Sequence, residues 1–425
     1  MRTLLYNIGT LAGILPQGRR MLCGIEMGKV ECMENAFLII NDGIIESFGK
    51  ASGNTPEGHF DNRIDAGGGY VMPTFCDSHT HIVYAGCRDG EFRDKIQGLS
   101  YEEIAARGGG ILNSADLLHG TSEDELFRQA MGRAEEVIAK GTGAIEIKSG
   151  YGLATEDELK MLRVIKRLKE VLPIEVKSTF LGAHAVGRAF KGNREGYVDL
   201  VCREMIPAVA AEGLADYVDV FCDEGFFTVE DTGRILETGS EYGLRPKIHA
   251  NELAVSGGVQ VGVKHGALSV DHLERTTDAE MDVLRGSGTM PTMLPGASFF
   301  LGMPYGRARD YVNAGLPVAL ASDYNPGSSP SGDMRFVWAL GCIRMKLTPE
   351  EAFNACTINS AYAMGVEDIL GSITVGKKAS LIVTKPLPSL TFIPYSHHSP
   401  FIERTIVQSF RNNAANNSTK TLQAK

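Results

Sequence analysis

From Tyr70 to about Val366, short apolar runs alternate with amphipathic segments in which apolar residues recur at helical spacing. Such segments include Glu123–Ala139 and Glu156–Val171. Eight strand–helix units in succession are typical of an α/β fold, a (β/α)8 barrel of the TIM type. An open doubly wound sheet is less well supported, because no glycine-rich phosphate loop follows the first run. The predicted barrel strands are Val71–His81, Gly143–Ile147, Glu175–Leu181, Tyr217–Phe221, Pro246–Ala250, Ala267–Val270, Thr289–Met293 and Pro317–Ala321.

The first 69 residues show a different pattern, with short alternating runs separated by turn residues. Asn41-Asp42-Gly43 lies between two of these runs and predicts a hairpin turn. We predict a small β-sandwich-like domain built from residues 1–69 and 367–411, a barrel of residues 70–366, and a polar tail of residues 412–425. The strands expected in the small domain are Leu4–Tyr6, Gly28–Cys32, Ala36–Ile40, Ile44–Gly49, Ile373–Gly376, Ser380–Thr384 and Phe401–Phe410.

Composition narrows the possible partners. The chain is 43% hydrophobic and carries a formal net charge of −10, which argues against nucleic acid or an anionic membrane as the main partner. A small anionic substrate stays possible, because one local arginine can bind it. The eight cysteines form no CxxC pair, so a thiolate zinc knuckle is not expected. With neither a long apolar span nor a signal peptide in view, we expect a cytoplasmic protein with reduced thiols.

A histidine pair ends the first predicted barrel strand. His79 and His81 are two residues apart, so in a strand both imidazoles point to the same side. His249, His272 and Asp323 end the fifth, sixth and eighth predicted strands. A single histidine at a strand end often only satisfies a hydrogen bond, but the carboxyl ends of all barrel strands meet at one mouth. We therefore predict a metal site there.

The ligand types indicate the kind of ion. Imidazoles together with one carboxylate suit a zinc or iron ion better than magnesium or calcium, which prefer oxygen ligands. We assign His79, His81, His249 and Asp323 as ligands of one ion. His272 is assigned as a histidine near the metal that does not bind it, with a fourth nitrogen ligand as the alternative.

Longer motifs extend from about residue 35 to about residue 410. They are Asp77–His81, Gly108–Ile111, Glu146–Leu153, Phe180–His184, His249–Leu253, Ser269–Glu274 and Ser322–Ser328. Through these motifs the chain resembles the imidazolonepropionase family of the amidohydrolase superfamily. The resemblance implies hydrolysis of 4-imidazolone-5-propanoate to N-formimidoyl-L-glutamate in histidine degradation, by an enzyme that is a homodimer. It implies the same four metal ligands, with substrate contacts at Arg88, Tyr151, His184, Asn325, Gly327 and Ser328.

Three alternatives compete with this interpretation. One subclass of the superfamily binds two metals through a carboxylated lysine, but Lys148 and Lys177 lie near the second and third predicted strands rather than on the fourth. A deaminase of a purine or triazine ring would use the same metal ligands without needing Arg88. A scaffold without catalytic activity would usually lack the metal ligands.

The implied chemistry suggests roles for the remaining residues. Glu252 lies three residues beyond His249 and is predicted to contact the substrate and to move a proton between water and the leaving ring nitrogen. His272 is predicted to orient the water or to stabilise the developing oxyanion. Asp323 belongs to the same catalytic set as a metal ligand.

The substrate's propionate tail calls for a cation. Arg88 can hold a carboxylate through two parallel hydrogen bonds, and the Tyr151 hydroxyl is predicted to join it. Tyr101 is a further candidate. His184 is predicted to contact a ring nitrogen, and the turn at Asn325-Pro326-Gly327-Ser328 is predicted to aim backbone groups and the Asn325 amide into the mouth.

Overall fold

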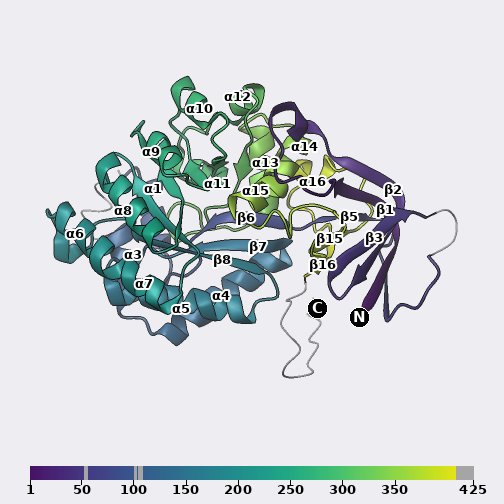
Figure 1. The fold of residues 1–425 in the computed structure, drawn as a ribbon, viewed down its shortest axis with the longest axis horizontal. Helices are drawn as coiled ribbons and strands as arrows, with labels where there is room; N and C mark the ends of the chain where they lie inside the picture. Colours follow the sequence, from purple (N-terminus) through teal and green to yellow (C-terminus); the bar gives the residue numbers. More distant parts are fainter. Residues whose placement is uncertain (52–55, 100–102, 104–108, 408–425) are drawn as a thin grey trace.

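The computed structural model describes residues 1–51, 56–99, 103 and 109–407. A barrel of parallel strands forms the larger part, and a mixed β-sheet lies at one side of it (Figure 1). Tyr101 and the predicted tail lie outside the described residues. No helix in the described ranges is long and apolar enough to cross a membrane.

The barrel sheet confirms the eight predicted strands, the fifth of which consists of two short pieces. Its order is β14-β13-β12-β11-β9-β8-β7-β6, and β10 pairs with β9. A parallel bridge between Thr80 and Tyr324 joins the first strand to the residues after the eighth. The strands are β6 (Phe75–Thr80), β7 (Thr142–Lys148), β8 (Glu175–Ala183), β9 (Tyr217–Cys222), β10 (Arg245–Pro246), β11 (Ile248–Ala250), β12 (Ser269–His272), β13 (Met290–Met293) and β14 (Ala319–Leu320).

Helices surround the barrel strands (Figure 1). Helix α4 shows why they form: Ser122 caps its first turn, and its apolar face, from Leu126 to Val137, is buried. The helices are α1 (Asp89–Ile96), α3 (Ile111–His119), α4 (Glu123–Ala139), α5 (Thr155–Val171), α6 (Arg194–Leu200), α7 (Ile206–Glu212), α8 (Val229–Glu241), α9 (Gly258–Lys264), α10 (Asp278–Leu284), α11 (Pro295–Leu301), α12 (Ala308–Asn313), α13 (Met334–Ile343), α14 (Pro349–Cys356), α15 (Ile358–Ala363) and α16 (Phe392–Tyr395), with the 3-10 helices η1 (Gly24–Gly28) and η2 (Arg188–Phe190) and the π-helix η3 (Val201–Met205).

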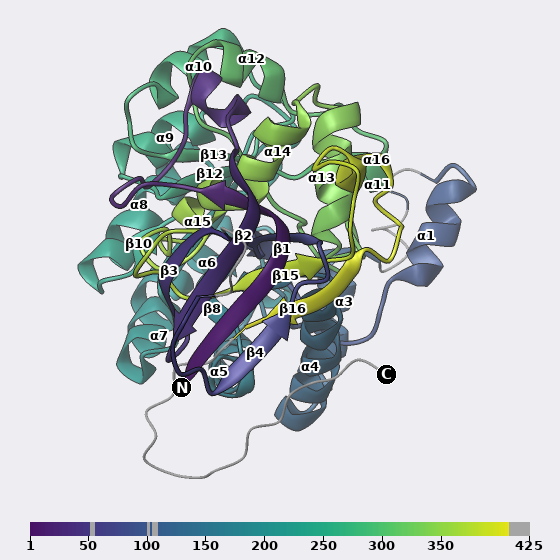
Figure 2. The ribbon, with the colours of Figure 1, turned by 90° about the vertical axis from the view of Figure 1, so that its right-hand side faces the viewer.

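The second sheet joins the two ends of the chain. Its order is β16-β15-β5-β1-β2-β3, and β4 pairs with β1. Figure 2 looks onto this sheet and shows N-terminal strands (purple) beside C-terminal ones (yellow). The predicted hairpin is confirmed, with positive φ angles of 47° at Asp42 and 78° at Gly43. The strands are β1 (Arg2–Ile14), β2 (Glu31–Asn41), β3 (Ile44–Lys50), β4 (Asn62–Asp65), β5 (Tyr70–Pro73), β15 (Leu381–Thr384) and β16 (Ile402–Ile406).

Some predicted strand limits differ from the structure. The run Val71–His81 is divided at Thr74 between β5 of the mixed sheet and β6 of the barrel. Ile373–Gly376 contributes one bridge, from Ile373 to Ile14, rather than a strand. Gly28–Cys32 is divided between η1 and the start of β2. The division of the chain into domains at residues 69 and 366 stays a prediction.

A buried carboxylate helps to close the barrel. Asp77 on β6 accepts hydrogen bonds from the Ser322 backbone N–H at 2.9 Å and from the Ser322 hydroxyl at 2.5 Å. Next to them, the Asp323 N–H donates to the His79 carbonyl at 3.0 Å, and the His81 N–H donates to the Tyr324 carbonyl at 2.9 Å. The first and eighth strands are thereby held in one register, which places Asp323 beside the histidine pair.

We expect Asp77→Ala to lower the free energy of unfolding by about 2–4 kcal/mol, because two buried donors of Ser322 lose their acceptor. Chemical denaturation measures the loss. The control is Asp282→Ala, an exposed aspartate whose removal should change stability by less than about 0.5 kcal/mol. Equal stability of the two variants would contradict a role for Asp77 in closure.

Candidate metal centre and substrate pocket

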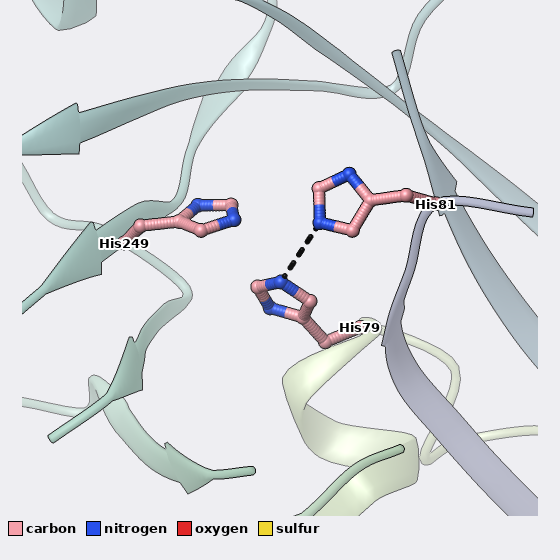
Figure 3. A group of neighbouring side chains, drawn as sticks. All are labelled: His79, His81 and His249. Carbon is pink, nitrogen blue, oxygen red and sulfur yellow. Dashed lines mark hydrogen bonds between the residues drawn. The ribbon is translucent and has the colours of Figure 1, made fainter. Parts of the chain in front are cut away.

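Three imidazoles converge on one point at the mouth of the barrel. Figure 3 shows the rings of His79 and His81, from the end of β6, turned toward that of His249 from β11. One ring nitrogen from each lies within 4.8 Å of the other two. The Nε2 atoms of His79 and His81 are 3.3 Å apart, and the buried Nε2 of His249 has no hydrogen-bond partner within the described residues. Buried ring nitrogens that face one another in this way fit a shared cation.

Asp323 completes the group. Its Oδ1 lies 3.6 Å from His79 Nε2 and 3.5 Å from His81 Nε2, and its Oδ2 accepts a hydrogen bond from the Ser328 hydroxyl at 3.3 Å. Its φ angle of 54° is uncommon for a residue other than glycine. This backbone conformation belongs to the turn that leaves β14 and directs the carboxylate inward.

The histidines are in the protonation state that a metal needs. Burial lowers the pKa values of His79, His81 and His249 below the ordinary histidine value, so all three are neutral near pH 7. Metal ligation requires this neutral form. The donor set of three imidazoles and one carboxylate therefore fits a divalent cation.

Two buried aspartates orient these ligands, and neither is among the residues predicted from the sequence. Asp271 Oδ2 accepts a hydrogen bond from His79 Nδ1–H at 2.7 Å, and Asp219 Oδ1 accepts one from His249 Nδ1–H at 3.0 Å. With each Nδ1 protonated, each Nε2 presents its lone pair to the site. One sequence feature could have indicated these supports: a charged residue in the middle of an apolar strand, such as Asp219 in Tyr217–Phe221.

His272 adjoins the metal ligands: one of its ring nitrogens lies within 4.8 Å of a ring nitrogen of His79 and a carboxylate oxygen of Asp323. Glu252 Oε2 is 3.6 Å from His272 Nε2, and Glu274 Oε1 is 3.5 Å from His272 Nδ1. Burial raises the pKa of Glu252 to about 7. Burial also disfavours the charged form of His272, but Glu252 and Glu274 outweigh this and raise its pKa well above the ordinary value. The pair therefore combines a carboxyl that titrates near neutrality with a cationic imidazole.

The loops that carry this pair are tightly held. Asp223, just beyond β9, accepts hydrogen bonds from the backbone N–H groups of Glu252 at 2.8 Å, of Leu253 at 2.9 Å and of Ala254 at 3.0 Å. His272 has a φ angle of 86°, a strained conformation for this residue type. Such backbone persists where neighbouring contacts fix it, so the position of this side chain is imposed by the fold.

Arg88, just before α1, provides a buried cation in the same pocket. Its Nε is 3.8 Å from a Glu91 oxygen and has no hydrogen-bond partner in the part of the chain that the structure describes. The guanidinium lies against Gly327: a Cβ added at this glycine would be 1.2 Å from Arg88 Nη2. Only glycine at residue 327 leaves room for Arg88 in this position.

Tyr151 and His184 form another part of the pocket wall. Both are buried, and the His184 ring stacks on that of His81 with centroids 5.4 Å apart. His184 Nδ1–H donates to the Gly150 carbonyl at 3.0 Å, and burial lowers the pKa of His184 to about 3. Its Nε2 is therefore a hydrogen-bond acceptor. Glu158 fixes the adjoining loop by accepting from the N–H groups of Gly150, Gly152 and Leu153 at 2.7–3.1 Å.

The turn after β14 is organised by Asn325. Its amide nitrogen donates to the Asp323 carbonyl and to the Ser328 hydroxyl, both at 2.7 Å. Its amide oxygen accepts from the backbone N–H groups of Gly327 and Ser328 at 2.8 and 2.7 Å. The Asn325 amide thus bonds within its own turn, so any contribution to the ligand is through the shape of the wall.

These residues line one open pocket of about 370 Å³, a size ordinary for a small-molecule site. Its lining combines polar side chains with apolar ones such as Phe221, Phe226 and Leu301. Among the predicted site residues that the structure describes, only the buried His79 is absent from the pocket wall. The predicted residues on the wall are His81, Arg88, Tyr151, His184, His249, Glu252, His272, Asp323, Asn325, Gly327 and Ser328.

Known proteins identify the family. The model of the amidohydrolase family matches residues 230–414. An imidazolonepropionase of Flavobacterium johnsoniae is 54% identical over 407 residues, which are 96% of this chain and 99% of that protein. One of Thermoanaerobacter pseudethanolicus is 38% identical over 92% of this chain and 93% of that protein. The chain belongs to the imidazolonepropionase family. It is therefore a metal-dependent hydrolase of C–N bonds.

Solved structures agree on the fold. A triazine hydrolase from Arthobacter aurescens superposes with a TM-score of 0.72 over 96% of this chain and 93% of that chain. An adenosine deaminase from Xanthomonas campestris with bound zinc gives a TM-score of 0.67 over 92% and 88%. Each is 15% identical to this imidazolonepropionase-family chain, so each likeness concerns the fold alone.

The buried cluster of His79, His81, His249 and Asp323, together with the match to the amidohydrolase family, indicates a divalent metal. The two lysines considered as bridging ligands have other partners. Lys148 Nζ is hydrogen-bonded to Glu146 at 2.6 Å and to Asp219 at 2.7 Å. Lys177 pairs with Asp216 at 3.5 Å, away from the pocket. The strand-four position of a bridging lysine is filled by the apolar and acidic residues of β9.

We expect His81→Ala to lose most bound metal, since one of the converging nitrogens disappears. Elemental analysis of the protein after equilibration with zinc and desalting measures this. The control is His59→Ala, because the His59 side chain is 90% exposed. Full metal content in the His81 variant would remove this residue from the ligand set.

Proposed function

We propose that this chain hydrolyses the ring C–N amide bond of 4-imidazolone-5-propanoate and releases N-formimidoyl-L-glutamate, a step of histidine degradation. Relatives named imidazolonepropionase, up to 54% identical, support this. The observation that carries the proposal is the shared pocket: buried Arg88 lines the same cavity as Glu252, His272 and the metal-binding group. A hydrolytic centre and a cation for a carboxylate tail therefore lie within reach of one small molecule.

We propose one zinc or iron ion, held by His79, His81, His249 and Asp323. When bound, such an ion supplies a water whose pKa is lowered toward about 7 and polarises a carbonyl oxygen. The three neutral imidazoles support zinc or iron over magnesium or calcium. Binding to the three imidazoles needs no change in their protonation.

Glu252 acts as the proton carrier in this proposal. With a pKa raised to about 7, its carboxylate accepts a proton from the attacking water and, as the acid, returns it to the departing ring nitrogen. Cationic His272 donates a hydrogen bond to the oxygen on which negative charge develops. Their separation of 3.6 Å supports a coupled pair with divided roles.

The substrate is oriented through its tail and through its ring. Arg88 binds the propionate, since its Nε is buried and lacks a hydrogen-bond partner among the residues described. Tyr151 lines the same pocket beside His184, whose Nε2 accepts a hydrogen bond from a ring N–H. Gly327 and Ser328 shape the wall behind Arg88 through the turn that Asn325 organises.

A deaminase acting on a ring without a carboxylate is the competing function. A deaminase is less well supported, because its substrate would have no carboxylate for the Arg88 guanidinium at the pocket wall to bind. In the proposed function Arg88 recognises the tail and Glu252 transfers the proton, so separate mutations can test the two roles.

We expect Glu252→Gln to keep its metal and lose turnover by about 10²–10⁴-fold, since an amide cannot carry the proton. Loss of imidazolonepropionate absorbance gives kcat, and elemental analysis gives the metal content. Glu241→Gln, an exposed residue at the end of α8, is the control. Near-normal kcat with bound metal would exclude Glu252 as the proton carrier.

We expect Arg88→Ala to raise KM by about 10–100-fold, the effect of losing charge-assisted hydrogen bonds to the tail. Gly327→Ala should raise KM as well with little loss of stability, because the new methyl displaces the guanidinium while the flexible side chain yields. Steady-state kinetics measure both variants. Gly132→Ala is the control, because apart from the neighbouring residues and the backbone of its own helix no described atom lies within 4 Å of the added methyl. An unchanged KM in the Arg88 variant would refute tail recognition.

A further inference from the structure

Below the metal-binding histidines, the barrel interior holds a cluster of charged side chains with no solvent exposure. They come from β7, β9 and β12 and from the short link between β10 and β11. Burying so many charges is costly unless each has a partner, so their arrangement needs a reason. This ion cluster consists of Glu146, Lys148, Asp219, Lys247 and Asp271.

Lys148 occupies the centre of the ion cluster. Its ammonium donates to Glu146 Oε1 at 2.6 Å and to Asp219 Oδ2 at 2.7 Å, and it lies 3.6 Å from Asp271 Oδ2. Asp219 and Asp271 are the two carboxylates that accept the Nδ1–H groups of the metal-binding histidines His249 and His79. One ammonium therefore adjoins the supports of two ligands from different strands.

Lys247 is equally buried but differently connected. Its ammonium contacts Glu146 and donates to the backbone carbonyls of Ser78 and Ala363, each at 3.2 Å. It is 3.9 Å from Asp271. Lys247 therefore bonds mainly to Glu146 and the backbone, whereas Lys148 bonds directly to one histidine support and adjoins the other.

The charges of the ion cluster also match the proposed occupant. Two ammonium groups against three carboxylates leave one negative charge. A cation at the histidines would place positive charge next to this excess negative charge, which reduces the cost of burying it.

We infer that Lys148 is a positioning residue of the metal site: it links Asp219 to Asp271 and so holds His249 and His79 as one preformed pair of ligands. The inference rests on the metal site proposed above. Residues that support metal ligands in this way commonly contribute about 10–100-fold to metal affinity. Lys148 acts on the ion through two carboxylates and two histidines, without touching it.

The test compares Lys148→Met with Lys247→Met. Both changes keep a long unbranched side chain and both leave Glu146 with one ammonium. Zinc affinity is measured on the purified full-length proteins by competition with a chromogenic chelator, so no catalytic readout is needed. We expect zinc affinity to fall at least about tenfold further in Lys148→Met than in Lys247→Met. Equal losses would overturn the inference.

A double-mutant cycle keeps the inference testable if a lysine variant fails to fold. Asp219→Asn and Asp271→Asn are measured singly and together, with Lys148 in place. If the lysine links the two aspartates, their effects on zinc affinity are not independent. The fold-loss of zinc affinity in the double variant should then be at least about fivefold smaller than the product of the two single fold-losses. Agreement with the product within about twofold would overturn the link.

A matched cycle combines Asp219→Asn with Ser328→Ala, whose hydroxyl supports Asp323 instead. Ser328 bonds to Asp323 and Asn325 in the turn after β14, outside the ion cluster, so these losses should multiply. The wild-type measurement separates the two proposals. Absence of zinc binding to the wild type would refute the metal site itself, whereas normal wild-type binding with equal lysine variants would refute only the role of Lys148.

Discussion

The site depends on the closure of the barrel between its first and eighth strands. Two backbone hydrogen bonds, Asp323 N–H to the His79 carbonyl and His81 N–H to the Tyr324 carbonyl, fix the register of that seam. Because alternate residues of a strand face opposite sides, a slip by one residue would turn the ligands away from the mouth. Asp77, bound twice to Ser322, reinforces the seam from inside. Residues over two hundred positions apart thus share one cation site.

A second constraint acts on the loops. Each of three loops that carry pocket residues is fastened by one polar side chain that accepts several backbone N–H groups. Glu158 does this after β7, Asp223 for the segment that carries Glu252, and Asn325 after β14. Backbone donors at loop starts would otherwise be buried without partners. The same bonds restrict the loops, so the pocket side chains that they carry are held in fixed positions.

Periodicity in the sequence predicts most of the architecture. The eight barrel strands correspond to the alternating apolar runs, and the four proposed ligands were found from their position at strand ends. The limits of the strands could not be predicted as well. Nothing in the sequence Val71–His81 marks Thr74 as the point where the chain passes from the mixed sheet to the barrel sheet. The supports Asp219 and Asp271 were missed because their function depends on neighbours that only folding supplies. The position of Asn325 in the sequence predicted that its amide points into the mouth of the barrel. In the structure its amide nitrogen instead donates hydrogen bonds to Asp323 and Ser328 of the same turn.

The histidines show why residue type alone does not define chemistry. His184 and His272 line the same pocket, yet burial lowers the pKa of the first to about 3 while two carboxylates raise that of the second well above its ordinary value. One presents a lone pair and the other a proton at the same pH. The difference arises from placement: His184 faces a backbone carbonyl and other rings, whereas His272 lies between Glu252 and Glu274. A hydrolytic site needs both kinds of group, and the fold makes them from one residue type by controlling where charge is buried.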